Sequence, residues 1–101
     1  MTAGDKGAAT QAAAAVQLCV HGRVQQVGFR RFVRSAAQRY GLKGWVRNTY
    51  DGSVEIWAEG PRSSVMSLLA DVQQGPSGSW VTDVEEAWMT PDGALDGFTI
   101  R

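Results

Sequence analysis

The chain has 101 residues, of which 44% are hydrophobic and 20% charged, and these proportions are typical of one compact globular domain. Its single cysteine, Cys19, excludes an internal disulfide and a CxxC metal site and suits a reducing compartment, so we expect a cytoplasmic location. We recognise no secretory signal and no apolar stretch long enough to span a bilayer, and we expect no membrane partner.

The formal net charge is zero, but the charge is distributed unevenly along the chain. Residues 21–50 carry seven basic side chains and no acidic one, whereas residues 51–101 carry nine acids against two arginines. A basic first half hints at an anionic partner. A dipolar surface that binds nothing agrees equally well with the composition alone.

The chain opens on small and polar residues, and we expect residues 1–15 to form a flexible leader and residues 16–101 to form the domain. From Val16 to Val20, apolar residues alternate with Gln17 and Cys19. This period of two predicts a half-buried strand at the start of the domain.

A glycine-flanked loop, Gly22–Gly28, follows the first strand. Apolar residues then recur from Phe29 to Tyr40 at the spacing of one face of a helix. Gly41 stands where helices commonly end. The segment therefore predicts a strand, a loop and an amphipathic helix in succession.

The second half of the chain repeats a similar alternation. Lys43–Asn48 and Val54–Glu59 read as two strands joined by the turn signal Asp51-Gly52. A second helix is predicted between Gly60-Pro61 and Gly75-Pro76, and two further strands are predicted at Val81–Met89 and at Phe98–Ile100. The order is βαββαβ with a short C-terminal strand. It predicts an α+β fold, a ferredoxin-like split βαβ sandwich whose antiparallel sheet carries two helices on one face.

The loop before the first helix is the best candidate for chemistry. A strand–loop–helix junction leaves unpaired N–H groups at the helix N-terminus, and such groups bind phosphate. Arg30 and Arg31 lie in this first turn, where a cation is unfavourable by roughly 0.3–1 kcal/mol. A bound anion would reverse that penalty, which favours a phosphate site. Two solvated surface arginines are the alternative reading.

Asn48 ends the second predicted strand and, taken alone, is most simply a turn residue. In a split βαβ fold, however, that strand runs back toward the start of the first helix, and Asn48 is therefore expected near Arg30. An amide can accept a hydrogen bond from water while donating one to a phosphoryl oxygen. Asn48 could thus orient a nucleophile.

Gly-Arg-Val-Gln-x-Val-Gly-Phe-Arg over residues 22–30, followed by Gly-Trp-Val-Arg-Asn over residues 44–48, resembles the acylphosphatase family, and the similarity extends over residues 16–101. The resemblance implies a ferredoxin-like fold and the hydrolysis of small acyl phosphates to a carboxylate and inorganic phosphate. It places the phosphate-binding arginine at Arg30 and the water-positioning asparagine at Asn48. It implies an amide cradle formed by Gln25, Gln26, Val27, Gly28, Phe29 and Arg30. No metal and no cofactor are implied, and we expect a monomer that binds its substrate, phosphate or other small anions.

The chain departs from the family at Gln26, where the family normally has Gly. If the loop requires a positive φ there, a side chain costs of order 1–3 kcal/mol. This departure favours the main alternative, a non-catalytic phosphate- or carboxyphosphate-binding module of the same fold, like the acylphosphatase-like domains of larger carbamoyl-transferring maturation proteins.

The remaining candidates for chemistry have simpler interpretations. The βαββαβ order also occurs in RNA-recognition modules, but carboxylates alternate with Trp57 on the third strand and no basic-Gly-aromatic run is present, so we expect no nucleic-acid partner. His21 is the only histidine, and because a lone histidine has no partner for a metal site it is interpreted as structural; Cys19 is likewise interpreted as a residue of the sheet.

Overall fold

The computed structural model describes residues 12–101, which form two helices and five strands. In chain order these are β1 (Ala13–Arg23), α2 (Phe29–Arg39), β2 (Lys43–Asn48), β3 (Val54–Pro61), α3 (Arg62–Gln74), β4 (Trp80–Met89) and β5 (Phe98–Ile100). The predicted order of elements is confirmed. Within the described part of the chain, no helix has the length and apolarity needed to cross a membrane.

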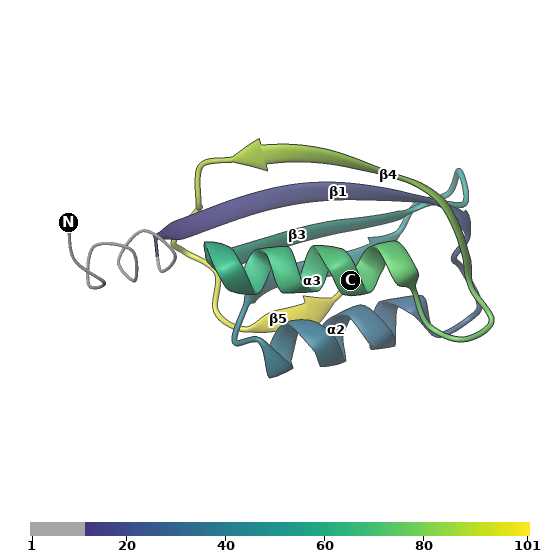
Figure 1. Cartoon of the computed structure of the whole chain (residues 1–101), viewed down its shortest axis with the longest axis horizontal. Coiled ribbons are helices and arrows are strands. Elements are labelled where there is room, and N and C mark those ends of the chain that lie inside the picture. The colour runs from purple at the N-terminus through teal and green to yellow at the C-terminus, as the bar shows by residue number, and fades with distance from the viewer. Residues whose placement is uncertain (1–11) are drawn as a thin grey trace.

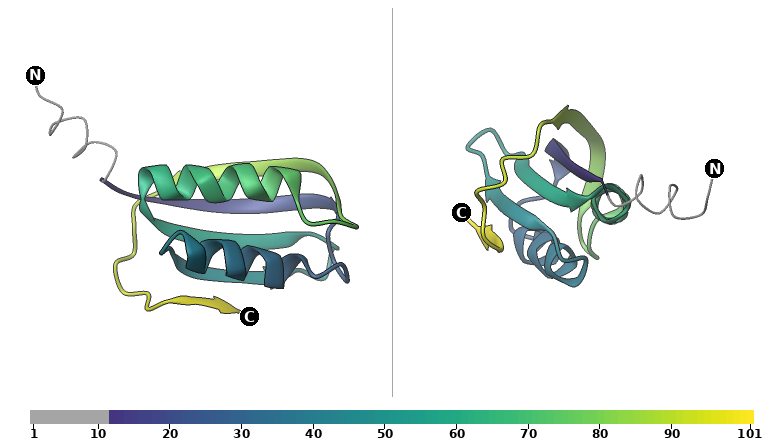
Figure 2. Two further views of the ribbon diagram at one scale, coloured as in Figure 1. Left: turned by 60° about the horizontal axis from the view of Figure 1, so that its bottom comes forward. Right: turned by 90° about the vertical axis from the view of Figure 1, so that its left-hand side faces the viewer.

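The strands form one sheet in the order β4-β1-β3-β2-β5. The first four strands pair antiparallel, as predicted, whereas β5 pairs parallel with β2 and makes the sheet mixed. Both helices lie along the same face of the sheet (Figure 1), and the two further views place α2 and α3 side by side on it (Figure 2). The architecture is the ferredoxin-like α+β sandwich that the sequence predicts.

The core lies between this sheet and the helices. Val16, Leu18 and Val20 of β1 are fully buried, as their alternation predicts. The helices bury most of the apolar stripes that their periodicity predicts, Phe29, Val33, Ala36 and Ala37 on α2 and Val65, Leu68, Leu69 and Val72 on α3. Phe32 and Tyr40, which belong to the first predicted stripe, pack against the core only partly buried. Because burying one large aliphatic side chain contributes about 1.5–3 kcal/mol, these stripes dock the helices firmly.

Strand β1 begins at Ala13, so the predicted leader extends three residues too far. Ala14 pairs with Gly60 of β3, and both Ala14 and Ala15 are buried. A run of alanines gives no alternation of apolar and polar residues, and the pairing depends on a strand more than forty positions away in the sequence. The rest of the expected leader, residues 1–11, lies outside the described residues.

Glu59 of β3 is a buried carboxylate, only 5% exposed. It accepts hydrogen bonds from the main-chain N–H of Asp92 at 3.0 Å and of Gly93 at 2.9 Å, and from the indole Nε1 of Trp57 at 2.7 Å. Burial alone would raise the pKa of Glu59, but the N–H donors of Gly93, Trp57 and Asp92 lower it below its ordinary 4.5. The ionised carboxylate thus fastens the segment between β4 and β5 to the sheet.

We expect Glu59→Gln to lower the free energy of unfolding by about 1–3 kcal/mol at neutral pH, because an amide offers one acceptor where the carboxylate offers two. Since folding lowers the pKa, this stabilisation is fully present above the ordinary value and is lost as the pH falls through the folded-state pKa. Urea denaturation at about pH 7 and about pH 4 tests this, and the difference between the two proteins should shrink at the lower pH. The matched control is Glu86→Gln, whose exposed carboxylate accepts one hydrogen bond, from Trp88 Nε1 at 3.3 Å, within residues 12–101; an equal loss there would contradict the prediction.

Candidate active site

The candidate residues come from strands that end at the same edge of the sheet. Val20 of β1 and Asn48 of β2 both pair with Val54 of β3, one on each side. Because both strands are antiparallel to β3, they run in the same direction and their C-terminal ends lie at one edge. Strand β5, parallel to β2, brings Ile100 toward this edge as well. The topology therefore places Asn48 beside the loop that follows β1.

The loop leaves β1 through an irregularity at Gly22, where the register with β4 shifts. A Cβ at Gly22 would lie 2.0 Å from the carbonyl oxygen of Trp80, so only glycine permits this close approach. Beyond the strand, Val24 and Phe29 are buried and Val27 packs partly buried against the core. Apolar anchors on both sides thus fix the course of the main chain around Gln26 and Gly28.

Helix α2 begins at Phe29 with Gly28 in the left-handed conformation at its N-cap. No side chain among residues 12–101 caps this end, and its first turn holds no acidic residue. The first N–H groups of a helix lack partners within the helix and carry partial positive charge. With Arg30 in the same turn, this end of α2 is suited to hold a tetrahedral anion.

A cleft of about 270 Å³ opens at this edge. The residues that line it are Val24, Gln26, Gly28, Phe29, Arg30, Arg31, Asn48 and Ile100. Arg30 and Asn48, eighteen positions apart in the sequence, thus share one cavity. Arg30 is half-buried, and its Nη1 donates to the main-chain oxygen of Arg101 at 3.3 Å, so that the segment at the end of β5 helps to orient the guanidinium.

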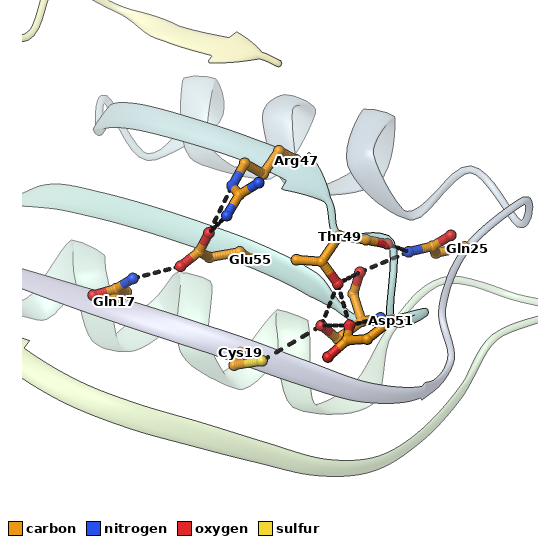
Figure 3. Close-up of polar contacts among 8 residues, drawn as sticks. Gln17, Cys19, Gln25, Arg47, Thr49, Asp51 and Glu55 are labelled. Atoms are coloured by element: carbon orange, nitrogen blue, oxygen red, sulfur yellow. Dashed lines mark hydrogen bonds and ion pairs between the residues drawn. The ribbon is translucent and has the colours of Figure 1, made fainter.

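Two of the predicted loop residues do not line the cleft. Val27 packs against the core, and the Gln25 side chain points to the turn between β2 and β3. Its Nε2 donates to the main-chain oxygen of Thr49 at 2.6 Å and to that of Ser53 at 2.8 Å. Figure 3 shows Gln25 reaching this turn. No pattern in the sequence predicts these two hydrogen bonds, which join the loop to the residue that follows Asn48.

The turn itself is held by the carboxylate of Asp51. It accepts hydrogen bonds from the Thr49 hydroxyl, from the Ser53 hydroxyl at 2.8 Å and from the Ser53 N–H at 3.1 Å (Figure 3). The hydrogen bonds from Thr49 and then from Ser53 lower the pKa of Asp51 to about 2. The carboxylate is therefore ionised throughout the neutral and mildly acidic range, and the turn keeps its shape there.

Gln26 adopts a φ of 63°, the only positive φ at a non-glycine residue within residues 12–101. The loop therefore does require a positive φ at the position where the family normally has Gly. A side chain in this region costs of order 1–3 kcal/mol at functional sites. The side chain of Gln26 also lines the cleft, at whose mouth a substrate would enter.

We expect Gln26→Gly to be more stable than Gln26→Ala by about 1 kcal/mol, because alanine keeps the Cβ that strains this conformation and glycine removes it. Both variants remove the long side chain from the cleft, so the comparison isolates the strain of the main chain. Thermal unfolding of the two variants and the parent measures the difference. Equal stability of the Gly and Ala variants would contradict a strained loop.

The chain is similar in sequence and in fold to known acylphosphatases. A family model for acylphosphatase matches residues 16–100. An acylphosphatase of Salinibacter ruber is 45% identical over 82 residues, which cover 81% of this chain and 86% of the relative. The crystal structure of acylphosphatase from Bacillus subtilis matches with a TM-score of 0.84 at 40% identity, over 87% of this chain and 98% of that one.

A larger protein also contains this fold. The crystal structure of full-length HypF in the phosphate- and nucleotide-bound form matches with a TM-score of 0.79 at 28% identity, over 90% of this chain but only 12% of that one. The stand-alone acylphosphatases are more similar in sequence and are matched over most of their own length. The comparisons therefore favour the enzymes over the binding-module alternative, and the chain belongs to the acylphosphatase family.

Proposed function

We propose that the protein is an acylphosphatase, which hydrolyses the bond between the carboxyl and phosphoryl groups of an acyl phosphate. The observation that carries the proposal is that Arg30 and Asn48 line one cleft at the uncapped N-terminus of α2. Such a cleft offers a guanidinium and main-chain N–H groups to a phosphoryl group, and an amide to a water molecule.

In the proposed reaction, the phosphoryl group enters the loop and its oxygens accept hydrogen bonds from Arg30 and from the N–H groups of the loop around residues 25–30. Asn48 orients a water molecule in line with the bond to be broken. A bond forms from the water oxygen to phosphorus as the bond from phosphorus to the acyl oxygen breaks. The acyl group leaves as a carboxylate, which needs no proton, and one water proton passes to a phosphoryl oxygen. Positioning and electrostatics supply the rate enhancement.

The experiment that tests the function is hydrolysis of benzoyl phosphate by the purified chain in the presence of EDTA. Turnover under these conditions supports the proposal. Binding of inorganic phosphate without turnover would instead favour the phosphate-binding module, and Gln26→Gly would then show whether the strained loop residue is responsible.

We further propose that the protein acts as a cytoplasmic monomer. The cleft is lined by residues of a single chain, so a second copy is not needed to complete it. The thiol of Cys19 is free and half-buried, which suits a reducing compartment. Light scattering coupled to size exclusion, with and without phosphate, tests the oligomeric state.

A further inference from the structure

Three metal-binding side chains meet on the sheet face that the helices leave open. Cys19 and His21 alternate with the core residues of β1 and therefore point away from the helices. Glu85 of β4 is the direct register partner of Cys19. One ligand atom from each of these residues lies within 4.8 Å of the others. None of the three lines the cleft at Arg30.

We propose that Cys19, His21 and Glu85 form a binding site for a divalent ion with the chemistry of Zn²⁺. A thiolate sulfur, an imidazole nitrogen and a carboxylate oxygen are the donors that zinc takes in proteins, and three protein ligands leave a fourth position for water. Magnesium and calcium take oxygen donors and make no use of sulfur. The donor set therefore selects a transition ion.

The present geometry is close to what such an ion requires. His21 Nε2 and Glu85 Oε2 are 2.5 Å apart, whereas bonds of about 2.0–2.3 Å to one tetrahedral ion hold neighbouring donors about 3–4 Å apart. A small rotation of the exposed Glu85 side chain opens that space. The Cys19 thiol now donates to the Ser53 hydroxyl over 3.6 Å (Figure 3), a weak contact that a metal bond would replace.

The main chain under the cluster is held in place. Cys19 is paired on both sides, with Glu55 of β3 and with Glu85 of β4, and His21 is paired with Asp83 of β4. The two ligands from β1 are therefore fixed in spacing, and only side-chain rotation is needed on binding.

The charges around the cluster also favour a cation. On binding, the Cys19 thiol gives up its proton to solvent and bonds to the ion as a thiolate. That thiolate and the Glu85 carboxylate together balance a double positive charge. Asp83, the register partner of His21, adds a further carboxylate to the same strand beside the site.

From the sequence, His21 is interpreted as structural because a lone histidine has no partner for a metal site. The fold supplies one from 64 positions away. The chain has a single cysteine and a single histidine, so both of its strongest transition-metal ligands lie in this one cluster. Binding of a thiophilic ion at a stoichiometry of one would therefore report on this site.

The test is calorimetric titration of the full chain, free of any histidine tag, with Zn²⁺, and spectroscopic titration with Co²⁺. We expect one ion per chain and a thiolate-to-cobalt charge-transfer band. Cys19→Ser, His21→Gln and Glu85→Gln should each weaken Zn²⁺ binding by roughly 10-fold or more, and Cys19→Ser should also remove the charge-transfer band. Hydrolysis of benzoyl phosphate in EDTA confirms that each variant is folded.

The matched control is Glu86→Gln, one residue further along β4. Glu86 pairs with the buried Leu18 and so lies on the opposite side of the sheet from the cluster. It should bind Zn²⁺ like the parent. Absence of Zn²⁺ binding, binding that survives Cys19→Ser unchanged, or an equal loss in Glu86→Gln would overturn the site. The proposed hydrolase activity, measured without metal, would stand in each case.

Discussion

Replacing Arg30 by Ala is expected to remove hydrolysis of benzoyl phosphate and binding of inorganic phosphate together. The guanidinium is the half-buried charge of the cleft, and it lies in the same helical turn as the uncapped N–H groups of α2. A positioned donor of this kind commonly contributes about 10²–10³ in rate, and a charged hydrogen bond contributes about 1.5–3 kcal/mol to binding. We therefore expect kcat/KM to fall by about 10³ or more and the inhibition constant for phosphate to rise at least about 10-fold.

The neighbouring arginine provides the matched control. Arg31 lines the same cleft and carries the same charge, but its side chain is exposed. If Arg30 acts by direct contact, Arg31→Ala should lower kcat/KM by less than about 10-fold, because an exposed charge is screened by water and salt. Equal losses in the two variants would mean that Arg30 contributes only to the general field of the basic half of the chain.

Arg30→Lys separates charge from shape. Lysine keeps the positive charge but loses the planar pair of donors that matches two phosphoryl oxygens. Its activity should therefore lie between those of the parent and Arg30→Ala. Because Arg30 also donates to the main-chain oxygen of Arg101, thermal unfolding of both variants must accompany the kinetics. Near-parental kcat/KM in a folded Arg30→Ala would contradict the proposed phosphate contact.

Most of the fold could be predicted because its local signals are strong. Strand β2 begins and ends where the sequence predicts, at Lys43 and Asn48, between a glycine-ended helix and an Asp-Gly turn. The apolar spacing in α2 predicts the residues that it buries. The start of β1 was predicted wrongly because a run of alanines shows no alternation of apolar and polar residues. Its strand conformation depends on pairing with β3.

The candidate site, like the fold, could be predicted only in part. Arg30 could be singled out because a cation is unfavourable in the first turn of a helix, and Asn48 because it ends a strand just before a turn. The topology then brings the two segments to one edge of the sheet. The contacts that hold them could not be predicted. The bonds from Gln25 to the turn after Asn48, and from Arg30 to Arg101, join residues 24 to 71 positions apart by side-chain geometry that no periodicity records. Parallel pairing of β5 with β2, which brings Ile100 to the cleft, is equally non-local.

Asn48→Ala should lower kcat by about 10²–10³ while changing KM and phosphate binding by less than about 3-fold. The reason for this split is that Asn48 is proposed to hold the attacking water, whereas Arg30 and the loop hold the phosphoryl group. Its position supports the division of roles, because it ends a strand on the far side of β3 from β1 and yet lines the same cleft as Arg30. Steady-state kinetics with benzoyl phosphate, together with inhibition by phosphate, measures both quantities.

Asn48→Asp decides whether the amide is needed as a donor as well as an acceptor. Aspartate has nearly the same size and accepts hydrogen bonds from water, but when ionised it cannot donate to a phosphoryl oxygen, and it adds a negative charge to the cleft. If the water needed only an acceptor, Asn48→Asp would retain more activity than Asn48→Ala. We expect the opposite order, with weaker phosphate binding in Asn48→Asp, because repulsion between two anions near Arg30 outweighs the retained contact to water. Full activity in Asn48→Ala would show that the loop and Arg30 suffice to direct water to phosphorus, and Asn48 would then be only the residue that begins the turn held by Gln25 and Asp51.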